Sequence, residues 1–198
     1  KAYPNNKIDI LSDGKTTFDA MFNAIQNAKN HIHIEFFIFG NDKISNQLRE
    51  LLIEKASAGV RVRMIYDYWG SFFLSRWYLQ SLREAGVYLR PFLPLRLRLG
   101  RSKINYRNHR KILIVDGEVG FTGGLNVADR YIFGNALGMW RDTFVRFEGS
   151  VVHGLQQLFL MDWYFVERKL ITDPKYYPMP QKFDTNLAQI VISGPDTQ

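Results

Sequence analysis

The chain has 198 residues, 46% hydrophobic and 23% charged, a globular composition that suits one α/β domain of ordinary size. It has no cysteine, which excludes disulfides and thiolate metal sites, and no run of eighteen apolar residues, which excludes a membrane span within it. Its net charge of +7 indicates an anionic partner: nucleic acid, an acidic membrane face or a phosphate-bearing substrate.

The first half of the chain alternates predicted helices with predicted strands. Apolar residues at helical spacing alternate with short aromatic and β-branched runs, a pattern typical of parallel strands joined by helices. The expected fold class is therefore α/β, a mixed, largely parallel β-sheet flanked by helices on both faces. The predicted helices are 17–30, 43–59 and 74–85, and the predicted strands are 31–39, 60–67 and 87–92.

The second half of the chain does not show this regular alternation of helices and strands. Two strands, 111–115 and 118–122, surround the Asp116-Gly117 turn, a further strand is expected over 140–149, and 151–165 has helical spacing. The proline-bearing tail is predicted to be a linker, with a strand at 188–193 that opens a second domain. We therefore expect a catalytic domain over 1–170, and over 171–198 a linker and the start of another domain.

The chemistry is concentrated around the strand that follows His109. Alternate side chains of a strand share a face, so His109 and Lys111 are predicted to project side by side, with Arg110 on the opposite face or the rim. The apolar run 112–115 predicts a strand buried on both faces. An imidazole beside an ammonium can attack or protonate a phosphorus centre while the ammonium holds a phosphoryl oxygen.

Residues after this strand complete the predicted site. Gly123 and Gly124 let the backbone approach a ligand closely, and Asn126 offers an amide donor to a phosphoryl oxygen. Asp142 is the candidate acceptor for the second nitrogen of the histidine, which would fix its tautomer. Asp116, at the far end of the strand, is expected to tie down the turn through backbone amides rather than to touch substrate.

Together these residues form the pattern HxKxxxxDxxxxxxGGxN, which resembles the motif of the phospholipase D superfamily. The segments "HIHIEFFIF", "WRD" at 140–142 and "DW" at 162–163 resemble the first catalytic half of bacterial cardiolipin synthases. "ISGPD" at 192–196 resembles the start of their second half. The motif positions, taken as catalytic apart from the two substrate-binding glycines, are His109, Lys111, Asp116, Gly123, Gly124 and Asn126.

The resemblance implies a phospholipase D-like half that works without metal or cofactor. One histidine attacks phosphorus to give a phosphohistidine, and a second histidine, from a partner motif, protonates the leaving alcohol and deprotonates the incoming one. For a cardiolipin synthase both substrates are phosphatidylglycerol, and the products are cardiolipin and glycerol. Such a domain would lie at the bacterial cell membrane, as a peripheral or cytoplasmic-face domain, with any anchor outside this sequence.

The sequence departs from the family pattern in two ways. Of the four histidines, His109 alone has a lysine two residues later, so the chain holds half of an active site. Either the second half belongs to the same longer chain, which the ending at 192–198 favours, or two copies meet as a homodimer. Many relatives have serine at the position of Gly124; glycine there resembles the cardiolipin synthase variant of the motif and removes one hydroxyl donor.

Glu35 and the other three histidines have structural as well as functional interpretations. Glu35 interrupts an apolar strand and is assigned, with Arg110, Gly123 and Gly124, to substrate binding, although a purely structural role is as well supported. His31 and His33 are expected at a strand edge and His153 on a helix surface. No metal site is predicted, because carboxylates are not clustered beside these histidines.

Two segments are predicted to contact lipid. From 87 to 115 there are eight basic residues and no acidic one, and leucine alternates with arginine in "LPLRLRLGR", which suits an anionic membrane surface. The segment 68–80 adds aromatic residues that favour an interface. The predicted contacts are Trp69, Phe72, Phe73, Trp77, Leu95, Arg96, Leu97 and Arg98.

Two other functions compete with lipid transfer. A single-motif dimeric phosphodiesterase or nuclease would also attack a phosphodiester, and its binding would depend steeply on salt. An inert half-domain that binds anionic lipid would only complete the site of a partner. The Leu-Arg segment and the aromatic residues favour lipid over nucleic acid as the partner.

Overall fold

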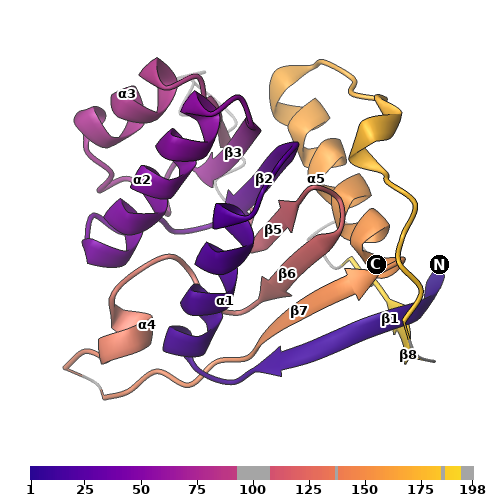
Figure 1. Cartoon of the computed structure of the whole chain (residues 1–198). Helices are drawn as coiled ribbons and strands as arrows, with labels where there is room; N and C mark the ends of the chain where they lie inside the picture. Colours follow the sequence, from indigo (N-terminus) through magenta and orange to yellow (C-terminus); the bar gives the residue numbers. More distant parts are fainter. Residues whose placement is uncertain (93–107, 137, 184–185, 193–198) are drawn as a thin grey trace, which may run out of the picture.

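The computed structural model describes residues 1–92, 108–136, 138–183 and 186–192, and in these residues eight strands form one sheet between two layers of helices (Figure 1). The strand order is β4-β3-β2-β5-β6-β7-β1-β8. The strands are β1 (Ala2–Leu11), β2 (His31–Phe36), β3 (Arg61–Asp67), β4 (Tyr88–Phe92), β5 (Ile112–Val115), β6 (Val119–Gly123), β7 (Phe144–Gly149) and β8 (Asn186–Gln189). The helices are α1 (Gly14–Gln26), α2 (Lys43–Ser57), α3 (Arg76–Glu84), α4 (Arg130–Phe133), α5 (Val151–Glu167) and the 3-10 turn η1 (Pro174–Tyr176).

The mixed α/β class is confirmed, but the sheet is not largely parallel. Parallel pairing joins β2 to β3 and β3 to β4, where α2 and α3 provide the crossovers. The pairs β2–β5, β5–β6, β6–β7, β7–β1 and β1–β8 are antiparallel. After β4 no long helix separates β5 from β6 or β6 from β7, and strands linked without a crossover can only pair antiparallel.

Two separate hydrophobic cores pack against the faces of the sheet. Side chains alternate along β2, so Ile32, Ile34 and Phe36 join the core under α1, α2 and α3. Along β5 the neighbouring Ile112 and Ile114 belong to the second core, under α5. Helices therefore cover both faces, as predicted, and every residue of β2 and β5 is buried.

The ends of the chain also join this sheet. The sequence analysis did not predict β1, which pairs with β7 from the far end of the domain. The strand expected over 188–193 overlaps β8, which pairs with β1. Residues on both sides of position 170 thus contribute to one sheet, and the start of a second domain after the linker stays a prediction.

The predicted edge positions of two histidines are wrong. His31 and His33 lie on β2, near the centre of the sheet, and are fully buried. The Gln156 side chain of α5 contacts His31 Nε2 at 3.2 Å and His33 Nδ1 at 3.1 Å. Burial lowers the pKa of His31 to about 4, so both rings pack as neutral aromatic groups. His153 is half-buried on α5, and its ring lies 2.8 Å from the carbonyl oxygen of Pro178.

Aspartates cap the first two helices. Asp13 caps α1 by accepting from the Thr16 N–H, and Asp42 caps α2 by accepting from the Ser45 N–H. In the described part of the chain no helix is both long and apolar enough to span a bilayer.

Candidate active site

The candidate site lies where the chain enters β5. This strand is hydrogen-bonded to β2 on one side and to β6 on the other. The predicted strand starts one residue too early, because β5 begins at Ile112 and residues 108–111 precede it. The segment that carries His109 and Lys111 is therefore fixed by the buried strand directly after it.

His109 and Lys111 lie side by side, as predicted. Lys111 Nζ is 3.0 Å from His109 Nδ1 and donates to the His109 carbonyl oxygen at 2.7 Å. The ring of Phe37 packs against both, 5.0 Å from the imidazole and 5.6 Å from the ammonium. Arg110 points away toward α5, where its guanidinium meets Asp162.

Burial and mutual repulsion change the charge of this pair. Burial lowers the pKa of Lys111 from 10.5 to about 8, against the opposing effect of Asp142. Desolvation and then the Lys111 charge lower the pKa of His109 below its usual value of 6.5. At neutral pH the pair is therefore a free imidazole beside an ammonium, which is the protonation state that nucleophilic attack on a phosphate ester needs.

Gly123 and Gly124 each have a neighbour too close for a Cβ atom, and the two neighbours differ. A Cβ atom on Gly123 would collide with the backbone of Thr143 and Phe144 across the β6–β7 pair. A Cβ atom on Gly124 would collide with the carboxylate of Asp142. The glycine at 124 thus leaves room for Asp142, which also raises the pKa of Lys111 through its charge.

Asp142 does not bond the His109 ring as predicted, and Asn126 is hydrogen-bonded within the protein. The Asp142 carboxylate accepts from the Thr143 backbone N–H at 2.7 Å, and the hydrogen bonds of the described residues do not bring it onto the His109 ring. Asn126 is buried, accepts from the Ile38 N–H at 3.1 Å and donates to the Tyr131 hydroxyl at 2.8 Å. A carboxamide nitrogen carries two hydrogens, and the bond to Tyr131 uses one of them.

Asp116 belongs to the fold rather than to the catalytic pair. Its carboxylate accepts from the backbone N–H groups of Lys29, Asn30 and His31 at 2.7 to 2.8 Å. As expected, the residue bonds backbone amides, but these open β2 rather than belonging to its own turn. Asp116 and Gly117 both have positive φ, as a tight hairpin turn requires. Its place among the catalytic residues is corrected, because the bonds tie the β5–β6 hairpin to β2.

Glu35 is buried beside Asn108, and the half-buried Arg110 pairs with Asp162. The Asn108 amide donates to Glu35, which is 1% exposed, and Arg110 Nη1 lies 2.6 Å from both oxygens of Asp162. The predicted substrate contact is not supported for Glu35, since its carboxyl faces side chains of the protein. The sequence analysis missed Asp162 and Asn108 as site residues, although a carboxylate at helical spacing among Leu155, Leu158 and Phe159 was a usable signal.

A pocket of about 870 Å³ opens beside the pair. His109, Lys111 and Arg110 line it together with Thr122 and Gly123. The rest of its wall comes largely from apolar side chains of β1, β7, α5 and the segment around β8. The catalytic strand thus faces a cavity that is basic at one end and mainly apolar elsewhere.

The predicted lipid-contact aromatics are exposed on the surface. Trp69, Phe72, Phe73 and Trp77 are between 44% and 82% exposed, and the Trp69 and Phe72 rings stack at 6.3 Å between centroids. The other four predicted contacts, Leu95, Arg96, Leu97 and Arg98, lie outside the described residues.

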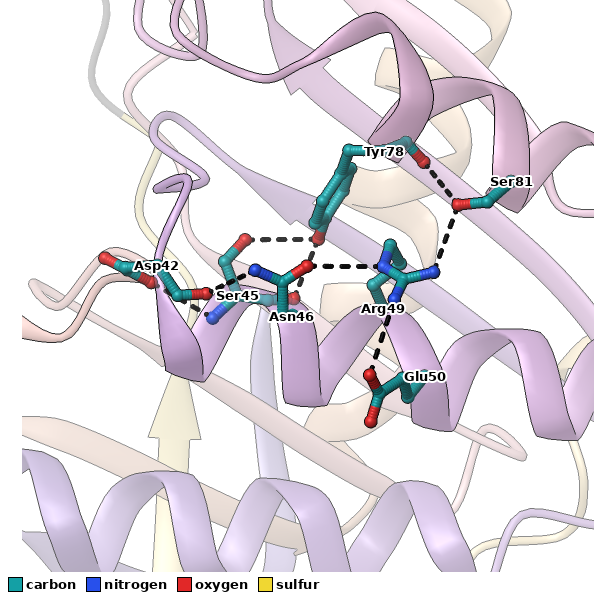
Figure 2. Close-up of polar contacts among 7 residues, drawn as sticks. All are labelled: Asp42, Ser45, Asn46, Arg49, Glu50, Tyr78 and Ser81. Atoms are coloured by element: carbon teal, nitrogen blue, oxygen red, sulfur yellow. Dashed lines mark hydrogen bonds and ion pairs between the residues drawn. The ribbon is translucent and has the colours of Figure 1, made fainter.

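A polar network joins α2 to α3, the helix that carries Trp77, and its hydrogen bonds are drawn in Figure 2. Arg49 of α2 donates to Ser81 Oγ of α3 at 3.2 Å, and Ser45 Oγ donates to the Tyr78 hydroxyl at 3.1 Å. The Arg49 guanidinium also lies 4.2 Å from the ring centre of Trp77. The network fixes α3 on α2, so Trp77 projects from a rigid base.

Comparison with known proteins places the chain in a family. The family model described as cardiolipin synthase, PLD-like domain, matches residues 21–163. The cardiolipin synthase of Geobacillus kaustophilus (strain HTA426) is 43% identical over 190 residues, which cover 94% of this chain and 38% of that protein. The major cardiolipin synthase ClsA of Bacillus subtilis (strain 168) is 40% identical, over 98% of this chain and 41% of that protein. The chain thus spans less than half the length of these relatives.

Solved structures show the same fold at low sequence identity. The phospholipase D family member Nuc from Salmonella typhimurium has a TM-score of 0.60 at 17% identity, covering 80% of this chain and 94% of that one. The phosphatidylserine synthase of Haemophilus influenzae Rd KW20 has a TM-score of 0.62 at 14% identity, covering 86% of this chain and 39% of that one.

Replacement by alanine should destabilise the protein more at Gly123 than at Gly124. Gly123→Ala should lower the free energy of unfolding by about 1–3 kcal/mol, because backbone atoms of β7 cannot move aside. Gly124→Ala should cost less than about 1 kcal/mol, because the Asp142 side chain can rotate away. Urea unfolding of both variants measures the difference, and equal losses would show that the close approach at β6–β7 is not rigid.

Proposed function

Because this chain belongs to the phospholipase D-like domain family of cardiolipin synthases, we propose that it is the first catalytic half of a phosphatidyltransferase that makes cardiolipin from phosphatidylglycerol. The observation that carries the proposal is the free imidazole of His109 held 3.0 Å from the Lys111 ammonium. The relatives at 40–43% identity are cardiolipin synthases by name, which supports this substrate class.

The proposed reaction exchanges one phosphodiester for another in two steps. The His109 nitrogen attacks the phosphorus of one phosphatidylglycerol, a P–N bond forms, and the P–O bond to glycerol breaks. A second histidine from the complementary motif gives its proton to the departing glycerol. The hydroxyl of another phosphatidylglycerol then gives its proton to that histidine and attacks phosphorus, which breaks the P–N bond and releases cardiolipin.

Lys111 and the motif residues are proposed to stabilise charge on the phosphoryl oxygens. The ammonium donates to one oxygen, and the remaining Asn126 N–H donates to another. Gly123 and Gly124 allow the phosphate to approach the backbone. Asp142, held over Gly124, is proposed to accept from His109 once the site is assembled, which would stabilise the imidazolium.

A second motif is part of the proposal, because the chain supplies one histidine-lysine pair. The relatives are more than twice as long as the region matched, which favours a second half in the same chain over a homodimer. The segment after β8 is proposed to lead into it. The pocket beside His109, basic at one end and mainly apolar elsewhere, suits an amphiphilic phosphodiester better than a nucleic acid.

Membrane contact is proposed for the exposed aromatic surface. Trp69, Phe72, Phe73 and Trp77 present rings suited to the interface of a bilayer, and the net charge of +7 favours anionic lipid. The domain would then act peripherally at the bacterial cell membrane, with its phosphate-binding pair close to the headgroups.

Loss of the nucleophile should abolish transfer. His109→Ala in the full-length protein should lower cardiolipin formation from phosphatidylglycerol vesicles by about 1,000-fold or more, with chelator present. His153→Ala is the matched control, because this histidine lies on α5 and bonds Pro178. Cleavage of single-stranded DNA without any lipid product would favour the nuclease, and absence of both reactions would favour an inert lipid-binding half.

Activity should fall at alkaline pH because Lys111 loses its proton. The pKa of Lys111 is lowered to about 8, so the ammonium is present below that pH and is lost as the pH rises through it. The kcat/KM for phosphatidylglycerol should therefore decline above about pH 8 in the free enzyme. Lys111→Arg keeps its charge and should move this decline to higher pH; an unchanged profile would exclude Lys111 as its cause.

The aromatic surface should anchor the protein to vesicles. Replacing Phe72 or Phe73 by serine should weaken binding to phosphatidylglycerol vesicles by about 10- to 100-fold each, because burying a phenyl group contributes about 1.5–3 kcal/mol. Met179→Ser is the control, since Met179 is 94% exposed and lies beyond η1, in the segment packed at the Gly117 turn. Co-sedimentation measures the affinities, and equal losses in all three variants would exclude a specific surface.

A further inference from the structure

We propose that Glu35 and Asp162 are positioning residues for His109, because their carboxyl groups hold the side chains of Asn108 and Arg110, its two neighbours. The inference deepens the proposed function and rests on it for the role of His109. Glu35, which was predicted to bind substrate, is thereby given the role of positioning His109, and Asp162 shares this role.

The backbone around His109 needs such support. β5 begins at Ile112, so the segment 108–111 lies outside the regular pairing that holds the strand. Thr122 Oγ1 donates to the Lys111 carbonyl oxygen at 2.8 Å, which fixes the end of the segment nearest the strand. At the end of the segment nearest Asn108, hydrogen bonds and ion pairs of side chains hold the backbone instead of β-sheet hydrogen bonds.

Glu35 holds the residue before His109. Asn108 is 5% exposed, and its amide donates to Glu35 Oε1. The Asn108 Oδ1 atom accepts from the Arg110 backbone N–H at 3.0 Å, closing a turn around His109. The carboxyl of β2 thus fixes an asparagine whose side chain spans the residue that would attack phosphorus.

Asp162 holds the residue after His109. Arg110 Nη1 lies 2.6 Å from both carboxylate oxygens of Asp162 on α5. Asp162 is 8% exposed, and a partly desolvated ion pair of this kind is costly to break by removing one partner. With Arg110 held toward α5, the neighbouring His109 is left on the other side, next to Lys111.

The two carboxyl groups belong to one cluster. The Oε2 atom of Glu35 is buried and has no hydrogen-bond partner among the described residues, while burial and then the Asp162 charge raise the pKa of Glu35 well above its usual value. A protonated Glu35 can donate from this oxygen to the Asp162 carboxylate. The cluster is then neutral overall, because Asp162 balances Arg110, and its buried groups are satisfied.

The test compares four variants of the full-length enzyme. Glu35→Gln keeps an acceptor for Asn108 and a donor toward Asp162, so kcat should stay within about 3-fold of wild type. Glu35→Ala should lower kcat by about 100-fold with little change in KM, because a displaced histidine costs reactivity more than binding. Asp162→Asn should also lower kcat, whereas Asp9→Asn, which removes a carboxylate from the Arg146 ion pair of β1 and β7, should leave it unchanged.

Two substrates are used so that a failure of the proposed function can be distinguished from a failure of the positioning role. Each variant is assayed with phosphatidylglycerol vesicles and with a small chromogenic phosphodiester that needs no lipid acceptor. Turnover of the small diester without cardiolipin formation in the wild type would overturn the proposed function and leave the comparison of variants valid. Should wild type process neither substrate, the rate at which diethyl pyrocarbonate modifies His109, followed by mass spectrometry, gives the same comparison.

Defined results would overturn the positioning role. These are a kcat for Glu35→Ala equal to that of Asp9→Asn, or a Glu35→Gln variant as impaired as Glu35→Ala. An unaltered rate of His109 modification in Glu35→Ala would do the same. If Glu35→Ala does not fold, as circular dichroism would show, the comparison of Glu35→Gln and Asp162→Asn with Asp9→Asn decides the question.

Discussion

The pairing of β5 with β2 on one edge and β6 on the other is the constraint on which the rest of this structure depends. Four buried residues, Ile112–Val115, lock the strand between two cores. Asp116 secures its far end by accepting three backbone N–H groups at the start of β2. A strand held in this way cannot slide by one residue without exchanging its faces, so the packing of β5 sets the direction in which the segment of His109 and Lys111 enters it.

Charge is distributed unequally on the two sides of this segment. On one side burial lowers the pKa of Lys111 to about 8. The neighbouring His109 imidazole is unprotonated at neutral pH, because desolvation and the Lys111 charge lower its pKa. On the other side Arg110 is paired with Asp162, and burial raises the pKa of Glu35 well above its usual value. Arg110 is paired with a carboxylate whereas Lys111 contacts His109, so the two adjacent basic residues have different surroundings, as the proposed roles require.

Helix α5 connects the fold to the proposed chemistry. The same helix supplies Leu155 and Phe159 to the second core, Gln156 to the buried histidines of β2, and Asp162 to Arg110. Its packing under the sheet therefore also sets the position of the segment before β5. On the opposite face α2 and α3, joined by the network of Arg49, Ser81 and Tyr78 (Figure 2), carry Trp77 at the surface. One sheet thus separates the support of the histidine from the proposed lipid contact.

Local sequence determined the elements whose signal is local: the buried run before Asp116, the hairpin turn at Asp116-Gly117 and the side-by-side placement of His109 and Lys111. It did not determine the antiparallel order of most of the sheet, the strand β1, or the central place of His31 and His33. The strand β1 depends on pairing between distant parts of the chain, such as Asn6 with Gly149 in β7, and the place of β2 depends on its pairing with β5. The tasks of Glu35, Arg110 and Asp116 were likewise decided by tertiary structure, because the energy of a buried charge depends on which distant donors and acceptors the fold brings to it.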